Sequence, residues 1–174
     1  MFEVARYTQH HSTIWDEFVT SSRNGSNLFL RSYMDYHKER FCDHSLLLYR
    51  NSRLEAVLPA NMEGNKLSAH SGLTYGYFVT NKLNFDYEAA FSTLIDYCQR
   101  IGVEEILYKP LPKSYQLHEN GHELYFLNKF LFQLAGQGLG NGFLISDGSQ
   151  FPPKKLRGSR QAIRHGLRVN RLVD

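Results

Sequence analysis

Hydrophobic positions along the chain follow two periods, one typical of strands and one typical of helices. Residues 45–49 and 54–58 are short apolar runs on either side of the polar tract 50–53, and this pattern predicts a β-hairpin. Further short strands are predicted at residues 2–7, 66–69, 105–108 and 138–146, with another beginning at 167–169.

The clearest helical period follows Asp86, which is placed to cap a helix. Phe91, Leu94 and Cys98 recur on one face of it together with Ile95 and Ile101, and Gly102 is suited to end the helix. Further helices are predicted at residues 12–23, 32–40, 124–134 and 153–165.

The order of these elements favours one fold class. Hairpin strands come first, and strands alternating with helices come later, which is typical of an α/β domain of α+β character with a mixed β-sheet flanked by helices. The 174 residues fit a single domain covering 1–174, because domains run on the order of 100–150 residues.

Composition places this domain in the cytoplasm. No run approaches the ~20 apolar residues of a membrane span, and the first residues lack the apolar core of a signal peptide. The two cysteines, Cys42 and Cys98, allow one disulfide at most, and Cys98 lies on the apolar helical face, where a buried thiol is expected.

The net charge of +3 is unevenly placed. Seven Lys or Arg residues and no acidic residue lie between positions 154 and 171. This segment is either a solvated helix face or a surface for an anionic partner. A nucleic-acid partner is disfavoured, because one basic helix without a recognisable binding motif is weak evidence for it.

Residues 118–122 spell H-E-x-x-H, which on a helix would hold zinc between two histidines. Here Asn120-Gly121 falls inside the motif, and this dipeptide favours a turn. We expect no metal site.

A second motif is Q-x-x-G-x-G, the form of the phosphate loop in acetyl-CoA-dependent enzymes. Such a loop needs a helix directly after it, whereas residues 143–146 look like a strand. A glycine-rich bend is therefore the alternative to a weak cofactor site. The motif residues are Gln137, Gly138, Gly140 and Gly142.

The run from His70 to Tyr77 combines glycines with polar and aromatic side chains. Gly72 and Gly76 would let a backbone approach a ligand closely, while His70, Thr74 and Tyr75 offer hydrogen-bonding groups. Tight loop packing is the alternative.

The pair Asp43-His44, close to Arg40 and His37, is open to two interpretations. It either forms a charged cluster in a cleft or is a polar lead into the hairpin.

Several of these segments, in this order, resemble the N-terminal lobe of the Fem-like acyltransferases of the GNAT superfamily. The resemblance implies a GNAT-like fold and acyl transfer, acetyl or aminoacyl, from a donor such as acetyl-CoA to an amine of a bacterial envelope or polysaccharide precursor. The segments are residues 27–41, 43–49, 58–61, 70–76 and 157–167.

The resemblance also assigns residues. Lys38 or Arg40 would meet an anionic substrate, and His70, Gly72, Thr74, Tyr75 and Gly76 would form the acceptor loop. A basic face would be formed by Arg157, Arg160 and Arg164.

Members of this family have two lobes, so we expect this chain to pair with a second lobe or a second copy. No catalytic residue is assigned by the resemblance. The alternative hypothesis is a non-catalytic binding module that uses the basic helix 154–168.

Overall fold

The computed structural model describes residues 1–112, 115, 121–137 and 153–168. The chain divides into two units, residues 1–133 and 134–174, and each is described by itself. A single domain over residues 1–174 stays a prediction.

The first sheet of unit 1 contains the predicted hairpin. Strands β1 (Glu3–Arg6), β3 (Leu46–Arg50) and β4 (Arg53–Leu58) pair antiparallel in the order β1-β3-β4. Asn51 and Ser52 connect β3 to β4, with φ of 51° and 59°. Two left-handed residues in a two-residue loop are typical of a hairpin turn that matches the twist of its strands.

The second sheet continues the same hairpin. Its strands are β2 (Cys42–Asp43), β5 (Asn61–Glu63), β6 (Lys66–Ser68) and β7 (Glu105–Leu107), in the order β2-β5-β6-β7. The pairs up to β6 are antiparallel, and β6 with β7 is parallel. The His44 N–H donates to the Ala60 carbonyl at 2.9 Å, so hydrogen bonding runs across the junction of the two sheets. The predicted mixed α/β fold is confirmed.

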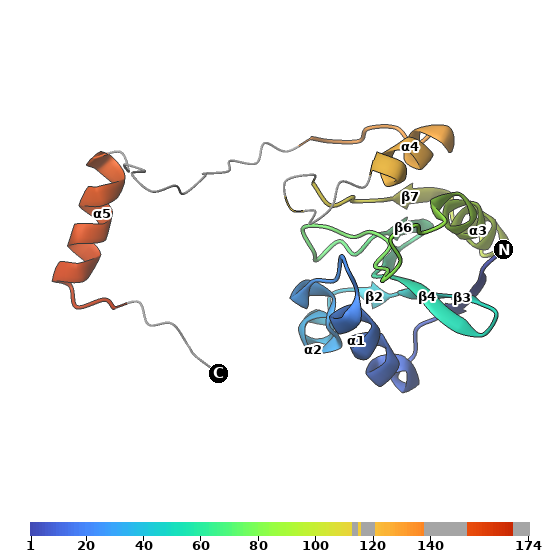
Figure 1. The fold of residues 1–174 in the computed structure, drawn as a ribbon, viewed down its shortest axis with the longest axis horizontal. Coiled ribbons are helices and arrows are strands. Elements are labelled where there is room, and N and C mark those ends of the chain that lie inside the picture. The colour runs from blue at the N-terminus through green and yellow to red at the C-terminus, as the bar shows by residue number, and fades with distance from the viewer. Residues whose placement is uncertain (113–114, 116–120, 138–152, 169–174) are drawn as a thin grey trace. The chain divides into compact units, whose positions relative to one another are not determined.

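Helices cover both faces of this strand layer. In Figure 1, α1 and α2 lie on one side of the strands, and α3 and α4 lie on the other. The bounds are α1 (Ser12–Ser21), α2 (Arg31–Met34), α3 (Tyr87–Arg100) and α4 (Gly121–Lys129), with short 3-10 helices at Gln9–His11, Asn27–Phe29 and Asp35–His37.

Two predicted helices differ in extent. The helix predicted at 32–40 is α2 followed by a 3-10 turn, so it ends by His37. The helix predicted at 124–134 begins at Gly121 and ends at Lys129, where Leu131 follows with φ of 61°. A leucine in the left-handed region cannot continue the helix.

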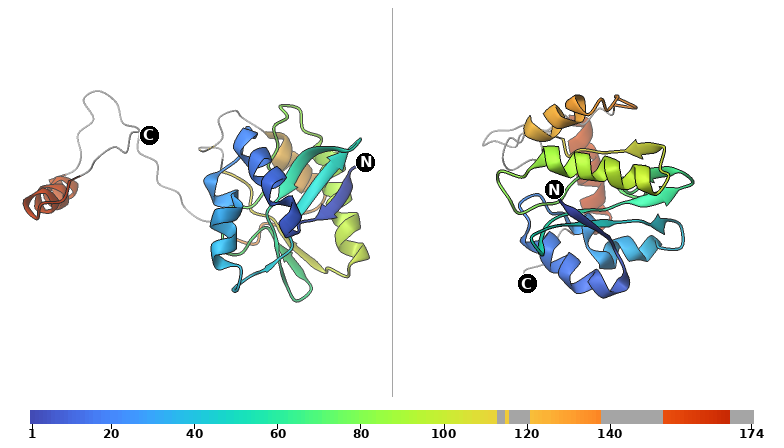
Figure 2. Two further views of the ribbon diagram at one scale, coloured as in Figure 1. Left: turned by 90° about the horizontal axis from the view of Figure 1, so that it is seen from below. Right: turned by 90° about the vertical axis from the view of Figure 1, so that its right-hand side faces the viewer.

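Alternate residues of β3 and β4 fill two separate cores. Leu46, Leu48 and Leu58 pack toward α3 and α4, whereas Leu47 and Val57 pack toward α1 and α2. Figure 2 shows these two pairs of helices on opposite sides of the strands. Because successive strand residues point to opposite faces, a strand covered on both sides must be apolar throughout. This explains why residues 46–49 and 56–58 are continuously apolar, and the buried Glu55 beside the second run is paired with Lys82.

Helix α3 follows its sequence prediction closely at both ends. The Asp86 carboxylate accepts from the Ala89 N–H at 3.0 Å, and Gly102 has φ of 77°. Phe91, Leu94 and Cys98 are buried as predicted, whereas Ile101 is 43% exposed. Ile101 lies after the last helical residue, so the helical period no longer sets its direction.

Unit 2 contains α5 (Pro153–Arg164), the predicted basic helix, and Gly166 follows it with φ of 79°. Leu167 and Arg168 are in no strand, so the strand predicted to begin there is not found at these two residues. Among the residues that the structure describes, no helix is both long and apolar enough to span a membrane.

Candidate functional site

The loop predicted to bind the acceptor, residues 70–76, is closely packed. The His70 imidazole is only 4% exposed and lies with its centroid 5.2 Å from that of the Phe41 ring. Burial lowers the pKa of His70 to about 4, so the ring is neutral near pH 7.

Packing accounts for the two glycines of this loop. A Cβ added to Gly72 would lie 2.5 Å from the Phe41 ring, and one added to Gly76 would lie 1.9 Å from the Ala69 carbonyl oxygen. Both positions therefore need glycine whether or not a ligand binds.

Lys109 fixes the backbone of the same loop. Its Nζ donates to the carbonyls of His70 at 2.7 Å and Leu73 at 2.5 Å, and its backbone pairs with Gly76. Thr74 is exposed, and Tyr75 is half-buried. The acceptor-loop assignment stays a prediction, and Tyr75 is the member that lines the cavity described below.

Asp43 and His44 make interior contacts. Asp43 forms an ion pair with Arg31 and accepts from the Ser45 N–H at 2.7 Å, and His44 Nε2 lies 2.7 Å from the Tyr97 hydroxyl. These contacts support the interpretation of a polar lead into the hairpin. Lys38 and Arg40 are both exposed.

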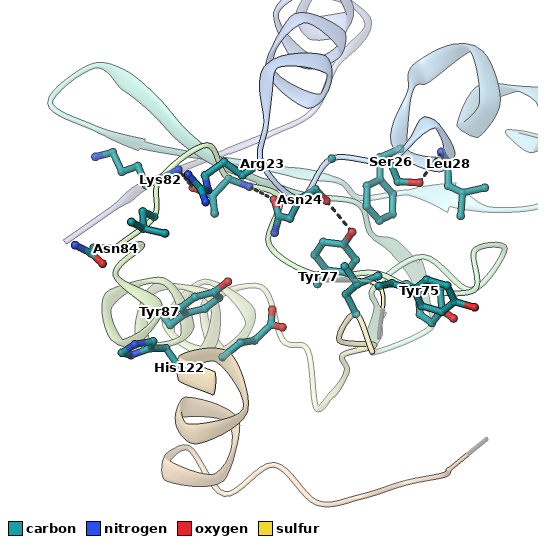
Figure 3. A pocket seen from close by; sticks show the side chains of 17 residues that line it. Arg23, Asn24, Ser26, Leu28, Tyr75, Tyr77, Lys82, Asn84, Tyr87 and His122 are labelled. Atoms are coloured by element: carbon teal, nitrogen blue, oxygen red, sulfur yellow. Dashed lines mark hydrogen bonds between the residues drawn. The ribbon is translucent and has the colours of Figure 1, made fainter. Parts of the chain in front are cut away.

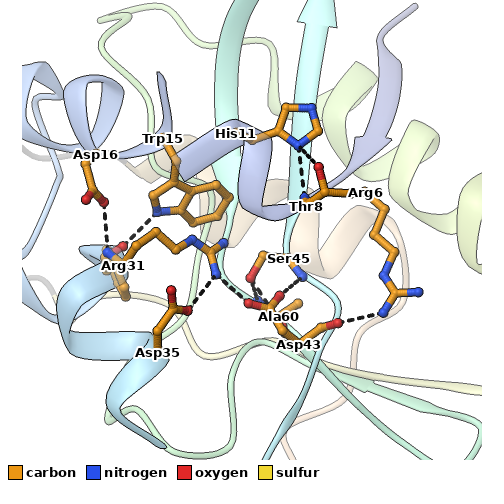
Figure 4. Close-up of polar contacts among 11 residues, drawn as sticks. Arg6, Thr8, His11, Trp15, Asp16, Arg31, Asp35, Asp43, Ser45 and Ala60 are labelled. Atoms are coloured by element: carbon orange, nitrogen blue, oxygen red, sulfur yellow. Dashed lines mark hydrogen bonds and ion pairs between the residues drawn. The ribbon is translucent and has the colours of Figure 1, made fainter. Parts of the chain in front are cut away.

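Arg31, rather than Lys38 or Arg40, is the buried base near this segment. It is 3% exposed, and its guanidinium lies 4.0 Å from the centroid of the Trp15 ring (Figure 4) and 3.3 Å from that of the Tyr7 ring. It also lies 3.9 Å from the Asp35 carboxylate. Its charge is paired with Asp35 and Asp43 inside the fold, although its Nε and Nη2 atoms have no hydrogen-bond partner among the described residues.

The remaining predicted residues lie outside unit 1 or outside the described residues. Arg157, Arg160 and Arg164 are exposed on α5 at spacings of three and four, so they share one face. Gln137 is exposed, whereas Gly138, Gly140 and Gly142 lie outside the described residues.

For the H-E-x-x-H motif, His118 and Glu119 lie outside the described residues, and His122 is exposed in the first turn of α4. No cluster of three potential metal ligands from His, Cys, Asp and Glu occurs in the described part of the chain.

Unit 1 contains a cavity of about 580 Å³, and Tyr75 is the one lining residue that the sequence analysis assigned to a binding site; Tyr77 and His122 occurred there only within motifs. Three parts of the chain that are far apart in the sequence form its walls, as Figure 3 shows. The lining residues come from the turn 23–29 after α1, from the stretch 75–87 that leads into α3, and from Leu111, Tyr115, His122 and Glu123.

Asn24 joins two of these walls. Its Nδ2 donates to the Phe78 carbonyl at 2.9 Å, its Oδ1 accepts from the Thr80 N–H at 2.8 Å, and its carbonyl accepts from the Tyr77 hydroxyl at 2.7 Å. The residues Asn24-Gly25-Ser26-Asn27 are typical of a turn, but nothing in their sequence indicates that this turn is bound to residues 77–80.

Glu123 supplies an acid to the cavity wall. It is 4% exposed, and its Oε1 accepts from the Tyr108 hydroxyl at 2.6 Å; the Phe78 N–H donates to that hydroxyl at 2.8 Å. Burial raises the pKa of Glu123 to about 7, against the opposing effect of the Tyr108 hydrogen bond. The carboxyl therefore exchanges its proton near neutral pH.

The N-terminus of α3, beside the cavity, is capped by the carboxylate of Asp86, the residue directly before the helix. Asp86 caps Ala89 and accepts from Arg50 Nη2 at 2.8 Å. The segment from Thr80 to Asp86 contains no glycine. This helix terminus therefore lacks the open N–H groups that bind phosphate in other proteins.

No protein-family model matches the chain, and no curated protein matches it. Among solved structures, the PaiA N-acetyltransferase of Thermoplasma acidophilum, in complex with coenzyme A, has a TM-score of 0.51 at 11% identity, covering 79% of this chain and 93% of that chain. The aminoglycoside N-acetyltransferase AAC(6')-Iy, in complex with CoA, has a TM-score of 0.51 at 10% identity, covering 82% and 95%.

A transcriptional regulator from Bacillus halodurans C-125 has a TM-score of 0.50 at 12% identity, covering 82% of this chain and all of that chain. At these identities the similarity is one of fold alone. The chain therefore has the mixed α/β fold of the GNAT-type acetyltransferases, and function has to be argued from its own residues.

Proposed function

We propose that this chain is an acyltransferase, or one lobe of one, which moves an acyl group to an amine bound in the cavity. The observation that carries the proposal is Glu123, a buried carboxyl with a pKa near 7 at the wall of a cavity large enough for a small molecule. The GNAT-type fold supports it, since solved acetyltransferases share that fold.

Glu123 would act as the general base. An ammonium group cannot attack a carbonyl until it loses a proton, and a base whose pKa lies near the working pH removes that proton efficiently. The amine nitrogen then bonds to the acyl carbon and the thioester or ester bond breaks; the nitrogen gives up its remaining excess proton as the amide forms, and the leaving sulfur or oxygen takes up one proton, directly or through water. The Tyr108 hydrogen bond fixes the direction of the carboxyl.

The donor is an activated acyl group, with acetyl-CoA or another thioester or ester as co-substrate and no tightly bound cofactor. The start of α3 does not fit the diphosphate of coenzyme A, because Asp86 holds that position. The alternative phosphate loop at 137–142 remains a prediction.

The more specific part of the proposal, which concerns the family subtype, the acceptor and the second lobe, rests on the sequence resemblance alone. In it the chain is the substrate-side, Fem-like lobe of a cytoplasmic bacterial enzyme, the acceptor is an envelope or polysaccharide precursor, and a second lobe or copy completes the site. The assignments of Lys38, Arg40 and residues 70–76 belong to this form.

The test is an acyl-transfer assay with the full chain, in which acetyl-CoA and aminoacyl esters are each offered to a panel of primary amines. Glu123→Gln should lower kcat/KM by at least about 100-fold, because general-base catalysis typically accelerates a reaction by at least that factor. Glu17→Gln, an exposed acid on α1, is the matched control. Equal activity of Glu123→Gln and wild type would contradict the assignment.

A non-catalytic binding module is the second candidate function. It is favoured by the exposed face of Arg157, Arg160 and Arg164 and by the lack of acidic residues from 154 to 171. Under this candidate, changing the three arginines to glutamate should abolish salt-dependent binding of an anionic partner, and the wild-type chain should show no acyl transfer in the assay above.

A further inference from the structure

The mouth of the cavity carries two basic side chains on one short stretch of its rim. The Arg23 N–H donates to the Thr80 carbonyl, and the Lys82 N–H donates to the Thr80 hydroxyl, both at 3.2 Å. One residue thus anchors the backbones of both bases. Figure 3 shows the two side chains on the same side of the cavity, away from Tyr75.

The two bases differ in how much of their charge is already neutralised. Lys82 forms an ion pair with Glu55, and Arg50 lies 3.9 Å from Glu55 and 2.8 Å from Asp86. We call these four residues the rim network; its two acids balance its two bases. Among the described residues, none pairs with the guanidinium of Arg23. Arg23 is therefore the surplus positive charge at this mouth.

The opposite part of the cavity has a different character. Tyr75 and Tyr115 lie with ring centroids 6.0 Å apart, and Leu111 also lines the wall. Glu123 is the single acid among the lining residues. The cavity thus combines an apolar wall, one acid and a surplus base at the rim.

Building on the proposed function, we propose that the acceptor is an amine that carries its own carboxylate or phosphate group. Its amino group would meet Glu123, and its anionic group would bind Arg23 with Lys82 beside it. A guanidinium is suited to this role because it presents paired donors to a carboxylate or phosphate.

The first experiment measures binding to the full chain without any acyl donor, by calorimetric titration. The probes are ω-amino acids of three to eight carbons, and each is paired with its uncharged amide. We expect the best amino acid to bind at least about 10-fold more tightly than its amide, as a charge-assisted hydrogen bond allows. Equal binding of acid and amide would overturn the proposal.

Variants assign the effect to Arg23. Arg23→Met should remove the preference for the acid, and Lys82→Met should reduce it less, because Glu55 already neutralises Lys82. Arg53→Met, at an exposed arginine that begins β4, is the control and should retain the full preference. Retention of the preference in Arg23→Met would also overturn the proposal.

A second experiment tests whether Arg23 binds the anionic group of the acceptor or a phosphate group of the donor. KM is measured for acetyl-CoA and for acetyl-pantetheine, which lacks the nucleotide. If Arg23→Met raises KM only for acetyl-CoA, the anion belongs to the donor and the acceptor assignment is wrong. An unchanged KM for both donors, with a raised KM for the amino acid, is the expected result.

Failure of the proposed function gives a different pattern. Amino acids would then bind in an Arg23-dependent way without transfer from any donor. Transfer that proceeds equally with acids and amides would instead remove the anion subsite and leave the acyltransferase proposal intact.

Discussion

The loop 70–76 and the cavity around Glu123 each contain a buried titratable side chain, yet their surroundings differ. Around His70 the space is filled by Phe41, and the loop carbonyls are taken up by Lys109. Beside Glu123 there is room for a ligand. A shifted pKa accompanies both, so burial alone does not distinguish a binding site from a well-packed loop.

The largest expected effect concerns the packing of the loop. Gly76→Ala would place its Cβ 1.9 Å from a backbone oxygen that cannot move aside. Overpacking against backbone should cost about 3 kcal/mol or more in the free energy of unfolding, measured by urea denaturation. Gly72→Ala meets only the Phe41 ring and should cost less, and Gly136→Ala, with open space around it, should be neutral.

Glu123 should make the protein less stable as pH rises. Its folded pKa of about 7 lies above the ordinary value of 4.5, so the folded state holds a proton that the unfolded state has lost between these two values. The contribution of Glu123 to the free energy of unfolding should therefore fall by roughly 2–3 kcal/mol from pH 4.5 to pH 7. Urea denaturation of Glu123→Gln and of the wild type across this range should differ by that amount, and equal pH dependence of the two proteins would refute the cause.

His70 should act in the opposite direction. Its folded pKa of about 4 lies below the ordinary 6.5, so between these values the unfolded state binds the proton more strongly. The contribution of His70 to the free energy of unfolding should drop by roughly 2 kcal/mol as pH falls from 6.5 to 4. Urea denaturation of His70→Gln over this range should lack the His70 contribution and keep that of Glu123.

The smallest effect is expected at Tyr75, the residue that belongs to both regions. Tyr75→Phe should change the free energy of unfolding by less than about 0.5 kcal/mol, because its ring stays half-buried. If the cavity binds the acceptor, KM for the acceptor should rise a few-fold while kcat holds. A loss of stability without a change in KM would assign Tyr75 to the loop instead.

Local features of the fold could be predicted from the sequence. The hairpin, the Asp86 cap and the glycine at 102 each depend on residues within a few positions of one another. The helix after Leu30 was predicted too long because its tyrosines at 33 and 36 are exposed and do not continue an apolar face. Periodicity alone did not reveal this.

The cavity could not be predicted in the same way. Its walls come from three distant parts of the chain, and hydrogen bonds such as that from the Tyr77 hydroxyl to the Asn24 carbonyl span 53 positions in the sequence. From the sequence alone, Glu123 is expected to be an exposed acid of an amphipathic helix. Its hydrogen bond with Tyr108, fifteen positions away, is evident only in the structure. The glycine-containing runs suggested binding loops instead, because a backbone that approaches a ligand and a backbone that packs closely against protein both require glycine.

The rim network has a consequence for how this protein can diversify. Its four charges stabilise the hairpin edge and the start of α3, so replacing any one of them leaves a partner charge uncompensated. Arg23 stands outside it, in an exposed turn position. Related proteins could therefore exchange the residue at 23 and change the charge of their ligand at little cost in folding, which makes this position a natural starting point for evolving new specificities.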